Sequence, residues 1–271
     1  MRSGATAPRN APPLSGRTKA LLRRLADRYE TAAFADGDPV GVLRALPPGP
    51  GAETAAFVAA CLSYGSRAQF LPKIRQLADA AQGDLHGWIL SGRFARAFRA
   101  GDPRSFYRLF SFGKMHAFFS VLRALLLRHG SLGAFLRASS ATDGPSALRA
   151  LCRAFAGRAA PVVPKDDTSA CKRLCLFLRW MVRDGSPVDT GAWSGWFDRR
   201  TLLVPLDVHV LRQARALGLL QGRTATMRAA NALTARLAEA FPSDPCRGDF
   251  ALFGLGVERA RAPRAVRIPS R

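Results

Sequence analysis

The chain has 271 residues, enough for one large domain or two small ones around a substantial core. Hydrophobic residues make up 48% of it and charged residues 22%, which excludes a disordered protein. Lysine and arginine total 41 against 19 acidic residues, and the net charge of +22 favours a polyanionic partner, nucleic acid before an acidic membrane. The same arginine bias also fits a GC-rich genome, which leaves open a ligand other than DNA.

Cysteine usage and the ends of the chain predict a reduced, cytoplasmic, nucleoid-associated protein without a cofactor or a structural metal. No apolar run approaches the roughly 20 residues of a membrane span, and residues 1–15 lack the apolar segment of a secretory signal. Cys61 and Cys152 lie in apolar helical patterns and are expected in the core. Cys171 and Cys175 have no second metal-ligand pair nearby.

Helical periodicity dominates the chain, strand-like alternation is absent, and the predicted fold class is all-α. Helices are expected near residues 18–35, 53–63, 67–81, 85–99, 103–111, 114–128, 131–138, 146–156, 169–183, 192–197, 208–217, 224–240 and 247–253. Residues 1–16 and 258–271 are expected to be basic tails. Aromatic residues at helical spacing are predicted to be core: Phe118, Phe119, Phe177, Trp180, Phe250 and Phe253.

One chemically interesting segment surrounds Lys172, one of only five lysines in the chain. Thr168 or Ser169 is a natural N-cap, which places Lys172 in the first turn of an apolar helix. A cation there opposes the helix dipole, and a lysine so placed can lose proton affinity and become a nucleophile. The segment alone favours a solvated lysine beside Arg173.

The second segment runs from Pro205 to Gly218 and reads PLDVHVLRQARALG. Asp207 is a good N-cap and Gly218 a good helix end, so Asp207 could be no more than a cap, worth about 1 kcal/mol. His209, in the first turn, is on its own more typical of a packed or solvated residue than of a base.

This second segment resembles the V-D-T-H-V-x-R-x-x-x-R-L-G segment of the helix-hairpin-helix DNA glycosylase superfamily, which includes endonuclease III and adenine glycosylase. Residues 55–69 (AAFVAACLSYGSRAQ) resemble its buried helix and DNA-inserting loop, and residues 249–256 (DFALFGLG) its closing helix beneath the active site. The chain as a whole resembles a bacterial family known mainly as a domain of unknown function, which is similar to the archaeal 8-oxoguanine glycosylases. The likeness covers about residues 20–257.

The resemblance implies a two-lobed fold within residues 17–257, with a middle lobe at about 64–200 and both chain ends in the other. It implies that Asp207 is the essential acid and Lys172 the Schiff-base nucleophile of a glycosylase with β-lyase activity on an oxidised purine. Residues implied at the DNA interface are Tyr64, Ser66, Arg67, Gln69, Lys165, Arg173, His209 and Arg212. Tyr64 would be the wedge in the base stack, and Arg67 would bond the orphaned base. The expected partner is duplex DNA with a damaged base or an abasic site, bound by a monomer.

The sequence departs from the superfamily at the hairpin, where Val163-Pro164-Lys165-Asp166-Asp167 contains no glycine, so an atypical hairpin is expected. Lys172 and Asp207 are 35 residues apart, with an insert carrying Trp193 and Trp196. For these two tryptophans ordinary packing is favoured over stacking on a flipped base. Other functions that fit the chain are a monofunctional glycosylase, an abasic-site lyase and a non-catalytic DNA-binding protein.

Overall fold

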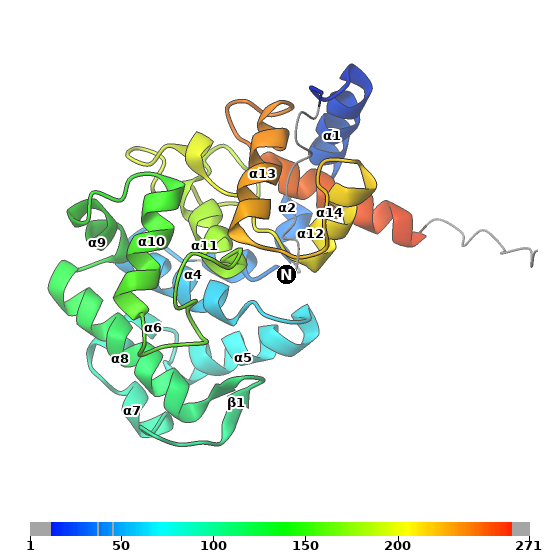
Figure 1. Ribbon diagram of the computed structural model, residues 1–271. Coiled ribbons are helices and arrows are strands. Elements are labelled where there is room, and N and C mark those ends of the chain that lie inside the picture. The colour runs from blue at the N-terminus through cyan, green and yellow to red at the C-terminus, as the bar shows by residue number, and fades with distance from the viewer. Residues whose placement is uncertain (1–11, 37, 45, 262–271) are drawn as a thin grey trace, which may run out of the picture.

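The computed structural model describes residues 12–36, 38–44 and 46–261, and the chain is mostly helical (Figure 1). Its elements are α1 (Gly16–Tyr29), α2 (Ala32–Asp36), α3 (Val40–Arg44), α4 (Pro50–Leu62), α5 (Arg67–Ala80), α6 (Leu85–Leu90), α7 (Phe94–Ala97), β1 (Ser105–Tyr107), β2 (Phe110–Ser111), α8 (Phe112–His129), α9 (Leu132–Ala138), α10 (Gly144–Phe155), α11 (Lys172–Val182), the 3-10 turn η1 (Arg199–Thr201), α12 (Val208–Ala216), α13 (Met227–Ala238) and α14 (Arg247–Arg261). Among these helices, none alone has the length and apolar composition to cross a membrane. α8 and α9, which are joined at a bend of 68°, meet the length and composition criteria only when they are taken together.

Two groups of helices meet at the centre of the molecule. α1, from the start of the chain, packs along α14, from its end, and α12 packs on the same helix. The approach of α1 to α14 is close because residue 254 is glycine, and a Cβ there would overlap the ring of Tyr29. α4 and α11 lie at the centre of Figure 1, with α5 to α10 on one side and α1, α12, α13 and α14 on the other. The two ends of the chain are therefore brought together beside the central helices.

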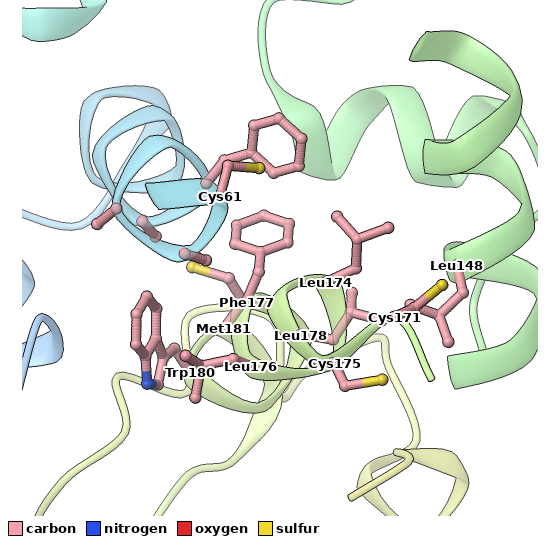
Figure 2. Packing of buried hydrophobic residues seen from close by; sticks show 14 of the residues in the cluster. Cys61, Leu148, Cys171, Leu174, Cys175, Leu176, Phe177, Leu178, Trp180 and Met181 are labelled. Carbon is pink, nitrogen blue, oxygen red and sulfur yellow. The ribbon is translucent and has the colours of Figure 1, made fainter. Parts of the chain in front are cut away.

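The core is built around α4 and α11, which pack against each other because both are apolar on nearly every face. Figure 2 shows Phe177 and Met181 of α11 pointing toward α4, which carries Cys61. The ring of Phe177 packs edge-on against Phe57 of α4 at a centroid distance of 5.1 Å. α11 is thereby fixed along its length, and its first residue, Lys172, has a defined position.

Two arginines are buried in this core, each at 2% exposure: Arg179 on α11 and Arg183, the residue that follows α11. Arg179 Nε lies 3.2 Å from the buried carboxylate of Asp189, and Arg183 donates to the other oxygen of the same carboxylate. Arg183 also bonds Glu30 at 2.6 Å and Asp244 at 2.8 Å. The burial of these cations is possible because each is paired with carboxylates, and the pairs tie α11 to both chain ends.

The aromatic predictions are confirmed for five residues and wrong for one. Phe118, Phe119, Phe177, Trp180 and Phe250 are buried, but Phe253 is 37% exposed. Trp193 is buried and donates from Nε1 to Glu53 at 2.9 Å, which agrees with a packing role. Cys61 and Cys152 are buried as expected.

Several predicted helices differ from the structure. Residues 103–111 form the antiparallel hairpin β1–β2 and not a helix, because the backbone turns at Arg108, whose φ is +50°. Residues 192–197 form turns, in which the backbone N–H groups of Trp196 and Phe197 donate to the carbonyl oxygen of Trp193. α14 continues to Arg261, beyond residue 258 where a tail was expected, because α14 packs along α1 and α12. Residues 1–11 and 262–271 of the predicted tails lie outside the described residues.

Candidate functional site

Lys172 and Asp207, predicted to act together, are brought together by the fold. Lys172 is the first residue of α11, and Asp207 caps the start of α12. Lys172 Nζ lies 4.0 Å from Asp207 Oδ2, and about a third of each side chain is exposed (32% and 33%). Two groups 35 residues apart in the chain therefore form a partly solvated pair of opposite charge at two helix starts.

The position of Asp207 follows from its capping role. Its Oδ1 accepts from the backbone N–H groups of His209 at 2.8 Å and Val210 at 2.9 Å. The predicted N-cap is thus confirmed, and Gly218 follows the end of α12 with a φ of +71°. Because capping occupies only Oδ1, Oδ2 is left to face Lys172. The cap therefore orients the carboxylate as well as stabilising the helix.

The start of α11 differs from the prediction that Thr168 or Ser169 caps the helix. Ser169 pairs with Thr226 in an isolated antiparallel bridge, and Met227 N donates to Thr168 O at 3.3 Å. This pairing keeps the chain extended up to Ala170. The N-cap position falls to Cys171, which has left-handed backbone angles (φ 44°, ψ 33°) and makes no side-chain cap bond. Lys172 is consequently at the first helical position, where the helix dipole makes a cation unfavourable.

The pair borders a cavity of about 520 Å³, called here the α14 cavity because that helix forms one wall of it. Its apolar surface includes Phe34, Phe70 and Phe253. Its polar groups, besides the pair itself, are Asp38, Ser63, Arg67, Arg179, His209, Arg212, Gln213 and Asp249. A mostly apolar cavity with a few converging polar groups is the usual form of a small-ligand site.

Arg179 and Asp249 form an ion pair that lines the α14 cavity. Arg179 Nη1 donates to Asp249 Oδ2 at 2.5 Å, while Arg179 Nη2 is buried with no hydrogen-bond partner within the described chain. Burial raises the pKa of Asp249 to about 6, a rise that Arg179 and Lys172 oppose and the carboxylate of Asp207 assists. Arg179, which lines the cavity, thus keeps one donor that is unpaired among the described residues, beside a carboxyl with a pKa of about 6.

A second cavity, of about 510 Å³, adjoins the α14 cavity at the pair and is called here the loop cavity. It is lined by the loop after α4 (Ser63 to Ser66), by the segment before α11 and by the start of α12. Lys172 and Asp207 line both cavities. The pair therefore stands where the two spaces meet.

The remaining sequence predictions divide into exposed and internally bonded residues. Tyr64, Ser66, Gln69, Lys165, His209 and Arg212 are all exposed. Tyr64, Ser66 and His209 line the loop cavity, and Arg212 Nη2 lies 3.4 Å from His209 Nδ1. Lys165 is outside the residues that line either cavity and lies 3.8 Å from Asp166.

Arg67 and Arg173 occupy places that the sequence did not predict. Arg67 turns into the α14 cavity, where it pairs with Asp38 at 3.0 Å and lies over the rings of Phe34 and Phe253. Arg173, expected at the DNA interface, donates to the carbonyl oxygens of Cys61, Pro161 and Val162 at 2.7–2.9 Å. It thereby ties the start of α11 to the end of α4.

Three polar residues of the α14 cavity were missed: Asp38, Arg179 and Gln213. Arg179 carried the clearest signal, since it interrupts an apolar helix that is otherwise buried. Asp249 lies in the segment expected to close beneath the site, and it lines the α14 cavity. Phe253 was taken for core because its spacing fits the buried face of α14, whereas a cavity opens beside its ring.

Titration of Asp249 gives a testable dependence of stability on pH. The native state holds its proton up to pH of about 6 and the unfolded chain releases it near pH of about 4, so the native state binds more protons between these values. The free energy of unfolding therefore falls as the pH rises through this window. We expect wild type to lose up to about 3 kcal/mol relative to Asp249→Asn between pH of about 4 and 7. Urea unfolding at both pH values measures this, and parallel pH dependences of the two proteins would contradict it.

Comparison with known families gives a single result. A family model described as "protein of unknown function (DUF2400)" matches residues 38–258, which include the Lys172–Asp207 pair and most of the residues that line the two cavities. No curated protein and no solved structure matches the chain.

Proposed function

The chain belongs to the DUF2400 family of proteins of unknown function, so its activity has to be inferred from its own site, and we propose that it is a DNA glycosylase with β-lyase activity. The proposed substrate is duplex DNA carrying an oxidised purine of the 8-oxoguanine type. The proposed fold is the two-lobed helix-hairpin-helix glycosylase fold with an atypical hairpin, bound to DNA as a monomer. The mostly helical structure and the union of the two chain ends agree with it.

The observation that carries the proposal is the Lys172–Asp207 pair at the border of two cavities. A glycosylase has to hold an extruded base on one side of the sugar and the DNA backbone on the other. Its reactive groups therefore have to stand between two spaces. The α14 cavity would take the base, and the loop cavity, open beside Tyr64 and Ser66, would face the DNA.

The chemistry would use both members of the pair. Once the Lys172 ammonium has given a proton to solvent, the lone pair of its amine forms a bond to C1′ of the nucleotide, while the electrons of the glycosidic bond leave with the base, which takes up a proton. Asp207 stabilises the positive charge that develops on the sugar and accepts a proton from the Lys172 nitrogen. Ring opening gives an imine, loss of a C2′ proton follows, and the bond from C3′ to the phosphate oxygen breaks. Arginine could not replace Lys172, because a guanidinium stays protonated.

The α14 cavity suits a purine in both shape and polarity. Its phenylalanine rings, among them the partly exposed Phe253, offer apolar faces on which a base can stack. The free Nη2 of Arg179 can donate to a base carbonyl, and the carboxylate of Asp249 can accept from a ring N–H. An oxidised purine presents more carbonyl and N–H groups than the undamaged base, so these partners favour it.

The proposal predicts the outcome of borohydride trapping on duplex DNA containing an abasic site or 8-oxoguanine. Wild type is expected to form a covalent adduct with both, and Lys172→Gln is expected to form none, because only the lysine amine yields a reducible imine. Lys19→Gln, which removes the same charge on α1, away from both cavities, is the matched control and should still be trapped.

Each other result has a defined meaning. An adduct on the abasic duplex alone would leave an abasic-site lyase. Excision without an adduct would leave a monofunctional glycosylase. Binding to DNA that shows neither reaction, and that Lys172→Gln does not change, would leave a DNA-binding protein and overturn the enzymatic proposal.

A further inference from the structure

The turn of the hairpin β1–β2 is formed by residue types that are unfavourable in a two-residue turn. Only Arg108 and Leu109 separate the two strands, and Arg108 has a φ of +50°. Two-residue hairpin turns favour asparagine and glycine, and a left-handed conformation costs a residue such as arginine about 1 kcal/mol. Leu109 is 59% exposed, although a leucine contributes most to stability when buried. A turn that gives up stability in this way indicates another role for the two side chains.

The hairpin tip is fixed to the loop that carries Tyr64. The Arg108 guanidinium lies over the Tyr64 ring at 4.9 Å, and its Nη1 donates to Gln69 Oε1 at 3.1 Å. The hydroxyl of Tyr107 donates to the carbonyl oxygen of Tyr64. Gly65 permits this approach, since a Cβ there would lie 2.6 Å from Arg108 Nη1. Tyr64, Arg108 and Leu109 therefore form one unit, here called the tip unit.

The tip unit stands next to the Lys172–Asp207 pair and is flanked by positive charge. Tyr64 lines the loop cavity together with Lys172. Lys114 Nζ donates to the carbonyl oxygen of Leu109 at 3.1 Å, and the Arg104 side chain is 75% exposed although it pairs with Asp102 at 2.7 Å. An exposed apolar side chain among cations complements a nucleic-acid duplex, whose bases are apolar on their faces and whose backbone is anionic.

We infer that the Arg108–Leu109 tip engages the DNA strand opposite the extruded nucleotide, an inference that rests on the proposed function. Tyr64 fills the gap that the nucleotide leaves, and Leu109 enters between two bases of the facing strand, as apolar wedges do from the minor groove. Arg108, held over Tyr64, donates to the base that has lost its partner. This is the task that the sequence had suggested for Arg67, whose guanidinium is engaged with Asp38 in the α14 cavity.

The decisive variant converts the tip to an Asn-Gly turn through the double substitution Arg108→Asn and Leu109→Gly. This pair suits a two-residue turn, so the hairpin should remain folded and the melting temperature should not fall. A tip that only closes the hairpin would leave DNA processing unchanged or improved. A tip that engages DNA would be lost. Leu127→Ala is the matched control, because Leu127 is equally exposed at 60% but lies on α8, away from both cavities.

The first readout is fluorescence of 2-aminopurine placed opposite an abasic site in a duplex. Insertion beside this base unstacks it, and unstacking relieves its quenching. We expect fluorescence to rise with wild type, Lys172→Gln and Leu127→Ala, and not with the Asn-Gly variant at saturating protein. An equal rise with the Asn-Gly variant would overturn the inference.

The second readout is the rate of borohydride trapping on the same abasic strand, either annealed or single. We expect the Asn-Gly variant to be trapped about tenfold more slowly than wild type on the duplex and equally fast on the single strand, because only the duplex has a facing strand to hold apart. A fluorescence rise without trapping by wild type would remove the lyase proposal and leave the tip inference standing. Trapping that the Asn-Gly variant leaves unchanged on both substrates would remove the tip inference alone.

Discussion

Asp207→Asn is expected to lower the rate of base excision from an 8-oxoguanine duplex about a thousandfold. The amide has nearly the same shape as the carboxylate but carries no charge to stabilise the sugar cation and takes up no proton. Asparagine is as good an N-cap as aspartate, so the backbone N–H groups of His209 and Val210 keep an acceptor and α12 keeps its start. The variant therefore separates the charge of Asp207 from its capping role.

Single-turnover excision by wild type and Asp207→Asn measures this effect, and Asp207→Ala provides the comparison. Alanine removes the cap as well, so it should also lower the free energy of unfolding by about 1 kcal/mol. A rate for Asp207→Asn within a few-fold of wild type would mean that Asp207 serves only as a cap. Trapping on a preformed abasic site should suffer less than excision, because no base has to leave in that reaction.

The parts of the site that could be predicted from the sequence depend on local rules. Asp207 was placed correctly because an N-cap depends on a few neighbouring residues, and α12 begins where its cap predicts. The pairing of Lys172 with Asp207 could not be predicted from either segment alone. It depends on α11 and α12 starting side by side, and the family resemblance, not local chemistry, suggested it.

The parts that were missed depend on contacts between distant segments. Ser169 cannot cap α11 because the chain there pairs with Thr226, more than fifty residues later. Residues 103–111 have aromatic spacing that fits a helix, and only the left-handed backbone of Arg108 makes them a hairpin. Asp38, just before α3, and Arg67, at the start of α5, meet at the α14 cavity because α3 and α5 both pack on α4. Propensity and periodicity carry no information on such encounters.

The buried ion network beneath the site gives the largest expected effect on stability. Asp189 has no exposed side-chain surface and bridges Arg179 and Arg183, which are themselves buried. Asp189→Ala removes the shared carboxylate and leaves two guanidinium groups close together with less compensation. We expect the free energy of unfolding to fall by about 3–5 kcal/mol, as when one partner of a buried ion pair is removed.

Asp184→Ala is the matched control for this loss. Asp184 pairs with Arg199 at 2.7 Å, but both side chains are exposed, so its removal should cost below about 1 kcal/mol. Urea unfolding of the three proteins at neutral pH compares the two effects, and equal losses would mean that Asp189 does not hold the network together. Because Arg179 also lines the α14 cavity, the Asp189→Ala protein should bind damaged DNA more weakly even where it is fully folded. If the Asp189→Ala protein keeps its affinity for damaged DNA at low temperature, the ion network contributes to stability alone.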